Sequence, residues 1–295
     1  MGGLKEIKTR IKSVTSTKKI TYAMKLVSAA KLGKAQDAVK RSREYTDGLK
    51  KLLAELVAAQ QGSDFTHPLT EAKPHTKRVK LIVLGANRGL AGPYNTRINQ
   101  KCEQFLREQQ AKGVAVETVI FGKKPAEYFR AQEMSYEQAY EDLSDSPDEW
   151  PLEDECMKAE QEFLDGSIDE LHLIYTKFKS AISQTLTADM LLPMSAQFIQ
   201  DEIGEQERAS GLTLFEPSIK EVFRAVLPRI MRSRVRQASQ DAKASEHGSR
   251  MAAMDNATKN AGELIDSLTL THNKLRQASI TGEILDIVGG AESSK

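Results

Sequence analysis

The sequence predicts two fold classes in one chain: an α/β domain and an all-α coiled coil. The 295 residues begin and end with long segments that have helical apolar spacing and few prolines, which is typical of coiled coils. Between them, strand-like and helix-like segments alternate, which is typical of an α/β fold. We therefore expect a long antiparallel two-helix coiled coil from the termini, with an inserted Rossmann-like α/β domain. The expected parts are residues 1–60, 61–215 and 216–295.

The N-terminal segment is expected to form one helix from Leu4 to about Ala58. Apolar residues recur at spacings of 3 and 4 over its first turns, and the stripe then slips to a second set: Leu4, Ile7, Ile11 and Val14, followed by Ile20, Met24 and Val27. About 55 helical residues span roughly 80 Å. A helix of this length needs an equally long partner to cover its apolar stripe.

The C-terminal segment is the expected partner. A short helical run follows Pro217, and we expect Pro228 to break or re-aim the helix because proline lacks an amide hydrogen. A broken apolar stripe then continues from Leu227 to about Val288 without another proline. Two such helices at opposite ends of the sequence predict antiparallel pairing.

The middle of the chain alternates between the two periodicities. Strands are expected at 78–84, 114–121, 170–176 and 184–192, the last at an edge, and helices at 94–112, 125–132 and 152–164. Residues 137–162 carry eleven Asp and Glu against one Lys, which we interpret as a solvated acidic loop and helix rather than a metal site.

Motifs for catalysis or cofactors are missing. The turn from Gly85 to Pro93 lies between a strand and a helix, where phosphate could bind, but it matches no nucleotide fingerprint. We therefore expect a structural turn in which Arg88 makes a local or interface contact. The histidines and two cysteines form no catalytic or metal-binding spacing. We expect no cofactor, no signal peptide and no membrane span.

Charge is strongly segregated along the chain. Residues 1–60 hold 14 Lys and Arg against 5 Asp and Glu, whereas residues 61–215 hold 16 against 26. A basic rod suits either a nucleic acid or a bore lined by carboxylates. A structural coiled-coil adaptor is a third interpretation, and composition alone leaves these open.

Two terminal motifs resemble the γ subunits of F-type ATP synthases. They are Ile20-Thr-Tyr-Ala-Met-Lys-Leu-Val-Ser-Ala-Ala-Lys31 and Lys274-Leu-Arg-Gln-Ala-Ser-Ile-Thr-Gly-Glu-Ile-Leu-Asp-Ile-Val-Gly-Gly-Ala291, and Asn87-Arg-Gly-Leu-Ala-Gly92 resembles the family's middle turn. The resemblance implies a central rotor shaft that carries torque between an ion-driven membrane ring and three catalytic sites, without catalysis of its own. Implied partners are the α and β subunits, the ε subunit and the membrane c-ring, with no nucleic acid.

The resemblance also implies interface residues. Met24, with Lys25 beside it, matches the position that faces a β-subunit loop, and antiparallel pairing is expected to bring a C-terminal cluster near it: Arg276, Gln277, Thr281 and Glu283. Ile284, Leu285, Ile287 and Val288 are expected to turn in an apolar collar, and Phe215 and Glu216 to touch the rotor ring. The expected location is the cytoplasmic face of a bacterial plasma membrane, as a peripheral subunit without bilayer insertion.

Overall fold

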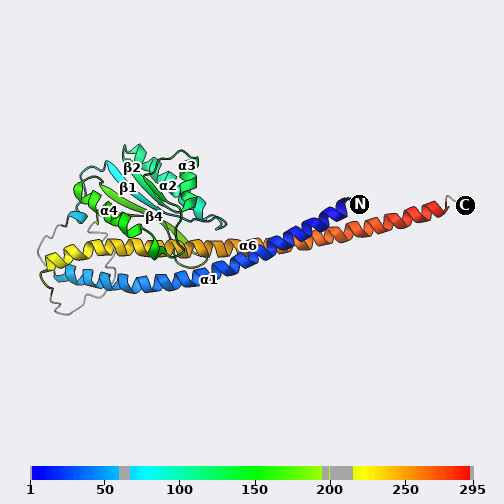
Figure 1. Cartoon of the computed structure of the whole chain (residues 1–295), viewed down its shortest axis with the longest axis horizontal. Helices are drawn as coiled ribbons and strands as arrows, with labels where there is room; N and C mark the ends of the chain where they lie inside the picture. Colours follow the sequence, from blue (N-terminus) through cyan, green and yellow to red (C-terminus); the bar gives the residue numbers. More distant parts are fainter. Residues whose placement is uncertain (1, 60–66, 195–198, 200–214, 293–295) are drawn as a thin grey trace. The chain divides into compact units, whose positions relative to one another are not determined.

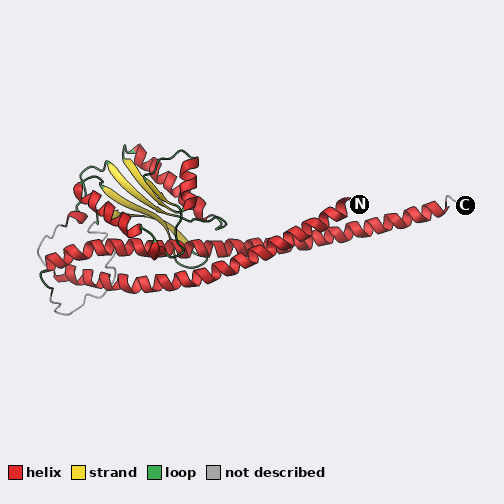
Figure 2. Ribbon diagram, in the orientation of Figure 1, coloured by secondary structure: helices red, strands yellow, loops and turns green. Residues whose placement is uncertain are grey.

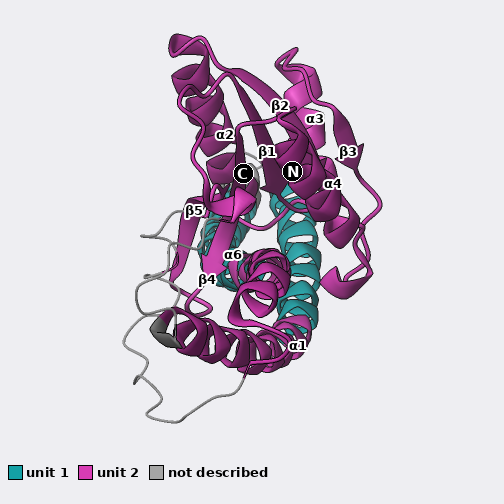
Figure 3. Cartoon of the chain, turned by 90° about the vertical axis from the view of Figure 1, so that its left-hand side faces the viewer, with its two compact units in different colours: residues 1–29, 250–295 teal, residues 30–249 magenta. Residues whose placement is uncertain are grey.

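The chain is described by a computed structural model that covers residues 2–59, 67–194, 199 and 215–292. It divides into two compact units, one made of residues 1–29 and 250–295 and the other of residues 30–249 (Figure 3). Both long helices contribute to both units. The domain limits expected from the sequence, at 60/61 and 215/216, remain a prediction.

A five-stranded sheet forms the centre of the unit of residues 30–249 (Figure 1). Its order is β3-β2-β1-β4-β5, with parallel pairing from β3 to β4 and antiparallel pairing of β5 at one edge. The strands are β1 (Arg78–Leu84), β2 (Ala115–Phe121), β3 (Gln138–Tyr140), β4 (Glu170–Phe178) and β5 (Gln184–Leu192). The predicted α/β fold and the predicted edge strand are confirmed.

Helices cover both faces of the sheet (Figure 2). On one face, Val79, Leu81 and Val83 of β1 pack with side chains of α2 (Tyr94–Ala111) and α3 (Lys123–Ala131). On the other, Ile82 and Leu84 share a core with α4 (Leu152–Asp165) and with parts of the two long helices. Every residue of β1 after Arg78 is buried, because strand alternation sends its side chains into both cores.

The two long helices are α1 (Gly2–Ala59) and α6 (Ile219–Glu292). They confirm the predicted helical termini, and α1 ends where its last buried leucines, Leu53 and Leu56, enter the sheet's core. Neither helix has one amphipathic stripe over its whole length, because α6 is buried on all sides from Ala238 to Gly248, whereas towards its C-terminus most of its residues are exposed.

The expected break at Pro228 is wrong, because α6 runs continuously through it. Proline leaves the carbonyl four residues earlier, that of Arg224, without its helical partner. A hydrogen bond joins the His67 ring to the backbone of Arg224, while the His67 Nδ1 accepts from the Leu69 amide at 3.0 Å. Burial, followed by the nearby Arg224 charge, lowers the pKa of His67, so the ring stays neutral with one donor and one acceptor. A side chain far away in sequence thus compensates for the proline.

Three short elements were not expected from the sequence. They are β3 and the two 3-10 turns η1 (Pro68–Thr70) and η2 (Pro147–Glu149). Each has only three residues, too few to display a periodicity.

Candidate partner-binding surface of the coiled coil

The seam of α1 keeps its 3-4 spacing without a slip through a polar stretch. Leu4, Ile7, Ile11 and Val14 are followed, at unbroken spacings of 4 and 3, by a polar stretch and then a mostly apolar one: Lys18, Thr21, Lys25 and Ser28, then Leu32, Ala35 and Val39. Thr21 and Ser28 are buried, whereas Ile20 and Val27 are 60% and 56% exposed. The expected slip of the stripe to Ile20 and Val27 is therefore wrong, since these apolar side chains point away from the seam.

Polar pairs join this stretch to α6 within the same unit. The Lys25 Nζ lies 2.6 Å from Asp255 Oδ1, and the Thr258 Oγ1 donates to Thr21 Oγ1 at 2.8 Å. The Lys18 ammonium lies 3.1 Å from the position that a β-carbon at Gly262 would take. As numbers fall along α1 they rise along α6, which confirms antiparallel pairing.

This register places the predicted C-terminal cluster away from Met24. Partner residues have numbers that add to 279 or 280, so Met24 lies opposite Asp255 and Asn256. The same sum sets Arg276 opposite the beginning of α1, about 20 residues or 30 Å along the helix from Met24. The expected juxtaposition of Arg276 and Met24 is wrong, because heptad spacing fixes the paired faces but leaves the register open.

The C-terminal site residues form an exposed helical segment. Arg276, Gln277, Thr281 and Glu283 are exposed, and the Thr281 hydroxyl donates to the Gln277 carbonyl at 2.9 Å. By the register, positions beyond about 278 lie past the first residue of α1. Ile284 and Leu285, in this overhang, are 55% and 65% exposed. Ile287 and Val288 belong to α6, but their side chains lie outside the described part of the structure.

Exposed apolar side chains also occur on the paired part of this unit. They come from both helices: Ile20, Tyr22, Leu26, Val27, Leu264 and Leu270. Met24 is partly buried between the seam and this surface. We call this set, with Met24, the apolar coil surface. On α1, Ile20 and Val27 lie on one flank of the seam and Tyr22 and Leu26 on the other, so the exposed apolar groups are spread around the rod, which suits contact with partners that surround it.

Electrostatics keep the polar seam charged. The hydrogen bond from Lys25, followed by that from Lys259 at 2.9 Å, lowers the pKa of Asp255 to about 2. The same carboxylate raises the pKa of Lys259. Asp255 and Lys259 are therefore ionised at neutral pH, and Asp255 pairs with a lysine of each helix.

The glycine turn after β1 is a close-packing device. A β-carbon at Gly85 would lie 2.6 Å from Pro125 Cγ, and one at Gly122 only 2.8 Å from the Gly85 carbonyl carbon. The Asn87 side chain donates to the Leu143 carbonyl at 2.8 Å. Glycines thus let the two strand-to-helix turns touch. Arg88 is exposed and its backbone carbonyl accepts from the Asn95 side chain, while the local or interface contact expected for Arg88 remains a prediction.

The two residues expected to touch the rotor ring differ in exposure. Phe215 is partly buried against the core that α4 and the long helices share, whereas Glu216 is exposed. A contact between Phe215 and the membrane rotor ring would therefore use only part of the Phe215 side chain.

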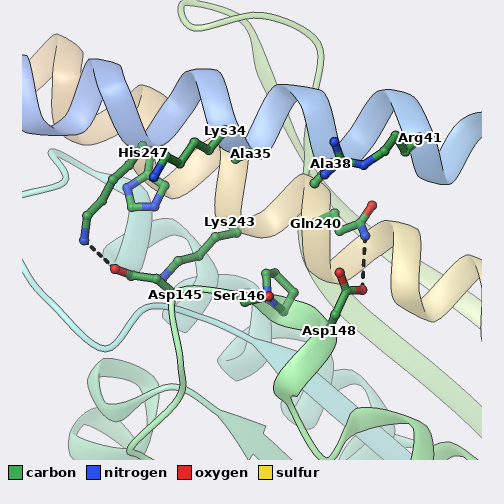
Figure 4. Close-up of a pocket in the computed structure, with 12 residues that line it drawn as sticks. Lys34, Ala35, Ala38, Arg41, Asp145, Ser146, Asp148, Gln240, Lys243 and His247 are labelled. Atoms are coloured by element: carbon green, nitrogen blue, oxygen red, sulfur yellow. Dashed lines mark hydrogen bonds and ion pairs between the residues drawn. The ribbon is translucent and has the colours of Figure 1, made fainter.

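The acidic stretch is more engaged than a solvated face. Asp145 pairs with Lys31 of α1 and with Lys243 of α6, the latter at 3.1 Å, and these residues line a cavity of about 310 Å³ (Figure 4). Both lysines lower the pKa of Asp145, Lys31 most strongly. Within the described ranges, no group of three His, Cys, Asp or Glu could hold a metal ion. The same ranges contain no helix long and apolar enough to cross a membrane.

Comparisons with known proteins decide the family. A family profile described as ATP synthase matches residues 3–293. The ATP synthase gamma chain of Moorella thermoacetica is 39% identical over 295 residues, covering all of both chains. That of Bdellovibrio bacteriovorus is 36% identical over 298 residues, again covering both chains fully. The chain belongs to the ATP synthase gamma chain family.

Solved structures agree with the fold. A chain of the Euglena gracilis mitochondrial ATP synthase, in an OSCP/F1/c-ring assembly, matches with a TM-score of 0.62 at 18% identity, covering 99% of this chain and 94% of that one. One from the Tetrahymena thermophila mitochondrial ATP synthase central stalk and c-ring matches with a TM-score of 0.56 at 23% identity, covering 81% of this chain and 99% of that one.

Family membership settles the role left open by composition. The chain is the central rotor shaft of an ATP synthase, a peripheral and non-catalytic subunit that assembles with others. The adaptor and nucleic-acid interpretations are thereby replaced. Sequence reasoning missed Thr21 and Thr258 as seam residues and Asp255 as their neighbour beside the seam. The signal was present, since the 3-4 spacing continues through polar residues.

Proposed function

We propose that the coil of residues 1–29 and 250–295 turns inside a ring of three α and three β subunits. One asymmetric rod cannot make equal contacts with three β subunits at once. Each third of a turn therefore changes which catalytic site is favoured, because differential contact shifts a conformational equilibrium. The shaft transmits torque between ion flow and ATP synthesis or hydrolysis.

The observation that supports this proposal is the apolar coil surface. Apolar contacts are non-directional and so oppose rotation weakly. The coil has already filled its seam, so Ile20, Val27 and Leu270 remain available to partners. Met24 lies at the edge of this surface, and we propose it as the residue that meets a β-subunit loop.

The C-terminal overhang is proposed as the pivot. Ile284 and Leu285 are exposed on a single helix that the register leaves without α1. Together with Ile287 and Val288 they would occupy an apolar collar at the top of the ring. Arg276, Gln277, Thr281 and Glu283 precede them and would contact β below the collar.

The opposite end of the shaft is proposed to stand on the membrane c-ring with the ε subunit beside it. Phe215 and Glu216 are the proposed contacts with the c-ring. Arg88 and, on the coil, Lys25 are proposed as further partner contacts. This arrangement places the chain at the cytoplasmic face of a bacterial plasma membrane, as a peripheral subunit.

Reconstitution tests the proposal. The full chain is mixed with α and β subunits, and the product is weighed by native mass spectrometry. We expect a 3:3:1 complex whose ATPase activity depends on this chain. Failure to enter the ring, or a ring with equal activity and no γ chain inside, would contradict it. A matched variant with Ile20→Asp and Val27→Asp should fold yet assemble poorly.

A further inference from the structure

The polar stretch of the coil seam occupies positions where a coiled coil normally has apolar side chains. Thr21, Lys25 and Ser28 lie at consecutive seam positions, with Lys18 one step earlier. Thr21 and Ser28 are nonetheless buried. Polar groups at such positions cost stability, so their presence calls for a compensating role.

The polar pairs observed across the two helices share one register. Lys25 meets Asp255 at 2.6 Å, and Thr21 meets Thr258 at 2.8 Å. The Thr258 hydroxyl also contacts the Met254 carbonyl at 2.7 Å, so the pair is held within a network. Two independent pairs with the same offset define the alignment of the helices.

An apolar seam alone would not define that alignment. Leu, Ile and Val repeat every seven residues, so sliding one helix by a heptad restores apolar contacts. The same slide, in either direction, separates Lys25 from Asp255 and Thr21 from Thr258. A slide in one direction sets Asp255 opposite Lys18, but Thr21 and Thr258 then face Met251 and Val14. A slide in the other direction sets Thr258 opposite Ser28, but Lys25 and Asp255 then face Gly262 and Leu32. Either slide loses at least one polar pair of the native register, which disfavours it.

Alignment matters because the apolar coil surface is built from both helices. Ile20 and Val27 come from α1, whereas Leu264 and Leu270 come from α6. A heptad slip displaces one set against the other by about 10 Å. A partner that contacts both helices would then meet a different surface.

We propose that Thr21, Lys25, Asp255 and Thr258 form a register lock that positions the partner-facing surface of the rotor. Asp255 is the central member, since it binds Lys25 and, at 2.9 Å, Lys259. These are positioning residues: they set the offset of the helices at some cost in stability. The coupling consequence rests on the proposed function, but the register lock itself does not.

Cysteine pairs placed outside the lock report the register in the full chain. Val14→Cys with Ile265→Cys has a sum of 279 and should cross-link in the observed alignment. Val14→Cys with His272→Cys reports a one-heptad slip. Native Cys102 and Cys156 are buried, so they should not compete.

Each reporter pair is compared in three backgrounds: the natural lock, an apolar lock in which all four residues become Leu, and a conservative lock with Lys25→Arg and Asp255→Glu. We expect the natural and conservative locks to cross-link only in the native register. The apolar lock should also yield the slipped product, while melting at a higher temperature. In reconstituted synthase it should pump fewer protons per ATP despite its greater stability.

The inference is overturned if the apolar lock cross-links only in the native register. An isosteric pair, Thr21→Val with Thr258→Val, answers the same question if the fourfold variant fails to fold. It should raise the melting temperature and increase the slipped product, and no slipped product would again overturn the lock. Slipped cross-links with unchanged coupling would leave the lock standing and contradict the proposed partner surface instead.

Discussion

Thr46 and Ser233 face each other with their hydroxyl oxygens 2.8 Å apart, buried although 187 residues separate them in sequence. Their numbers add to 279, as do those of Thr21 and Thr258 in the other unit. The same helix offset therefore holds in both units. Buried hydroxyl pairs contribute little net stability but are costly to leave unpaired, so they favour one alignment over others.

Met24→Lys should lower coupling more than ATPase rate. The new ammonium would lie beside Lys25 at the edge of the apolar coil surface, without a carboxylate of its own. We expect protons pumped per ATP to fall by about twofold or more, because an uncompensated charge at a partly buried contact costs several kcal/mol. Proton pumping and ATP hydrolysis are measured on the same vesicles. Met24→Leu is the control, and equal coupling in both variants would argue against Met24 as a contact.

Asp241→Asn should remove a pH dependence of stability. Asp241 is 1% exposed, and burial raises its pKa to about 6, opposed by the charges of Arg43 and Lys177. A raised carboxyl pKa favours folding below the unfolded value of about 4, and this contribution is lost as pH rises through 6. The natural chain should therefore lose roughly 2–3 kcal/mol between pH 4 and 8 from this group.

The measurement for Asp241 is thermal unfolding of the full chain at several pH values. The asparagine variant should be more stable than the natural chain at pH 8, with a difference that shrinks towards pH 5. A pH-independent difference would show that Asp241 is ionised throughout.

Gly122→Ala should destabilise the α/β region by about 3 kcal/mol or more, through positive-φ strain and steric overlap. Gly122 has a φ of 119°, and a β-carbon there would lie 2.8 Å from backbone of Gly85. Gly33→Ala is the matched control. It lies within α1 with no atom near the new methyl, so it should stabilise by up to about 1 kcal/mol. Urea unfolding compares the two, and equal effects would contradict the close-packing account of the turn.

Lys80→Met should destabilise the sheet by about 1–3 kcal/mol, since two partly buried carboxylates lose their shared cation. Lys80 is fully buried and its Nζ lies 2.5 Å from Glu162 and 3.1 Å from Glu137. Lys158→Met is the control, because Lys158 also pairs with Glu137 but is 48% exposed. Adding Glu137→Gln and Glu162→Gln should restore part of the stability lost by Lys80→Met. If the two lysine variants unfold at equal urea concentrations, burial of Lys80 is not decisive.

The sequence predicted the fold where periodicity is long. The seven strands and helices expected between 78 and 192 all form, because each shows several turns or alternations of apolar residues. It failed at β3, whose three residues show no pattern and form a strand only by pairing beside β2. It also failed at Pro228, since tolerance depends on His67, which lies more than 150 residues earlier.

The seam was misread for a physical reason. Apolarity suggested Ile20 and Val27, yet these side chains point outwards to the surface. Thr21 and Lys25 could be recognised as seam residues only by extending the strict 3-4 spacing, and their partners only from coordinates. Register is a property of two helices together, so no single stripe determines whether Met24 faces Asp255 or Arg276.

The hairpin between β4 and β5 offers a site for a marker that reports rotation of the chain. Ile182, in that hairpin, is 94% exposed, so Ile182→Cys can carry a bead or fluorophore. Cys102 and Cys156 will not react, because burial raises the pKa of each thiol to about 12.

Rotation of that marker is the most direct test of the proposal that this chain turns as a shaft inside the ring. Complexes of the labelled chain with α and β subunits are fixed to a surface through the ring and supplied with ATP. The account predicts one-directional rotation in steps of one third of a turn, stopping when ATP is removed. A ring that hydrolyses ATP while the marker stays at one angle would contradict the role of this chain as the rotating shaft.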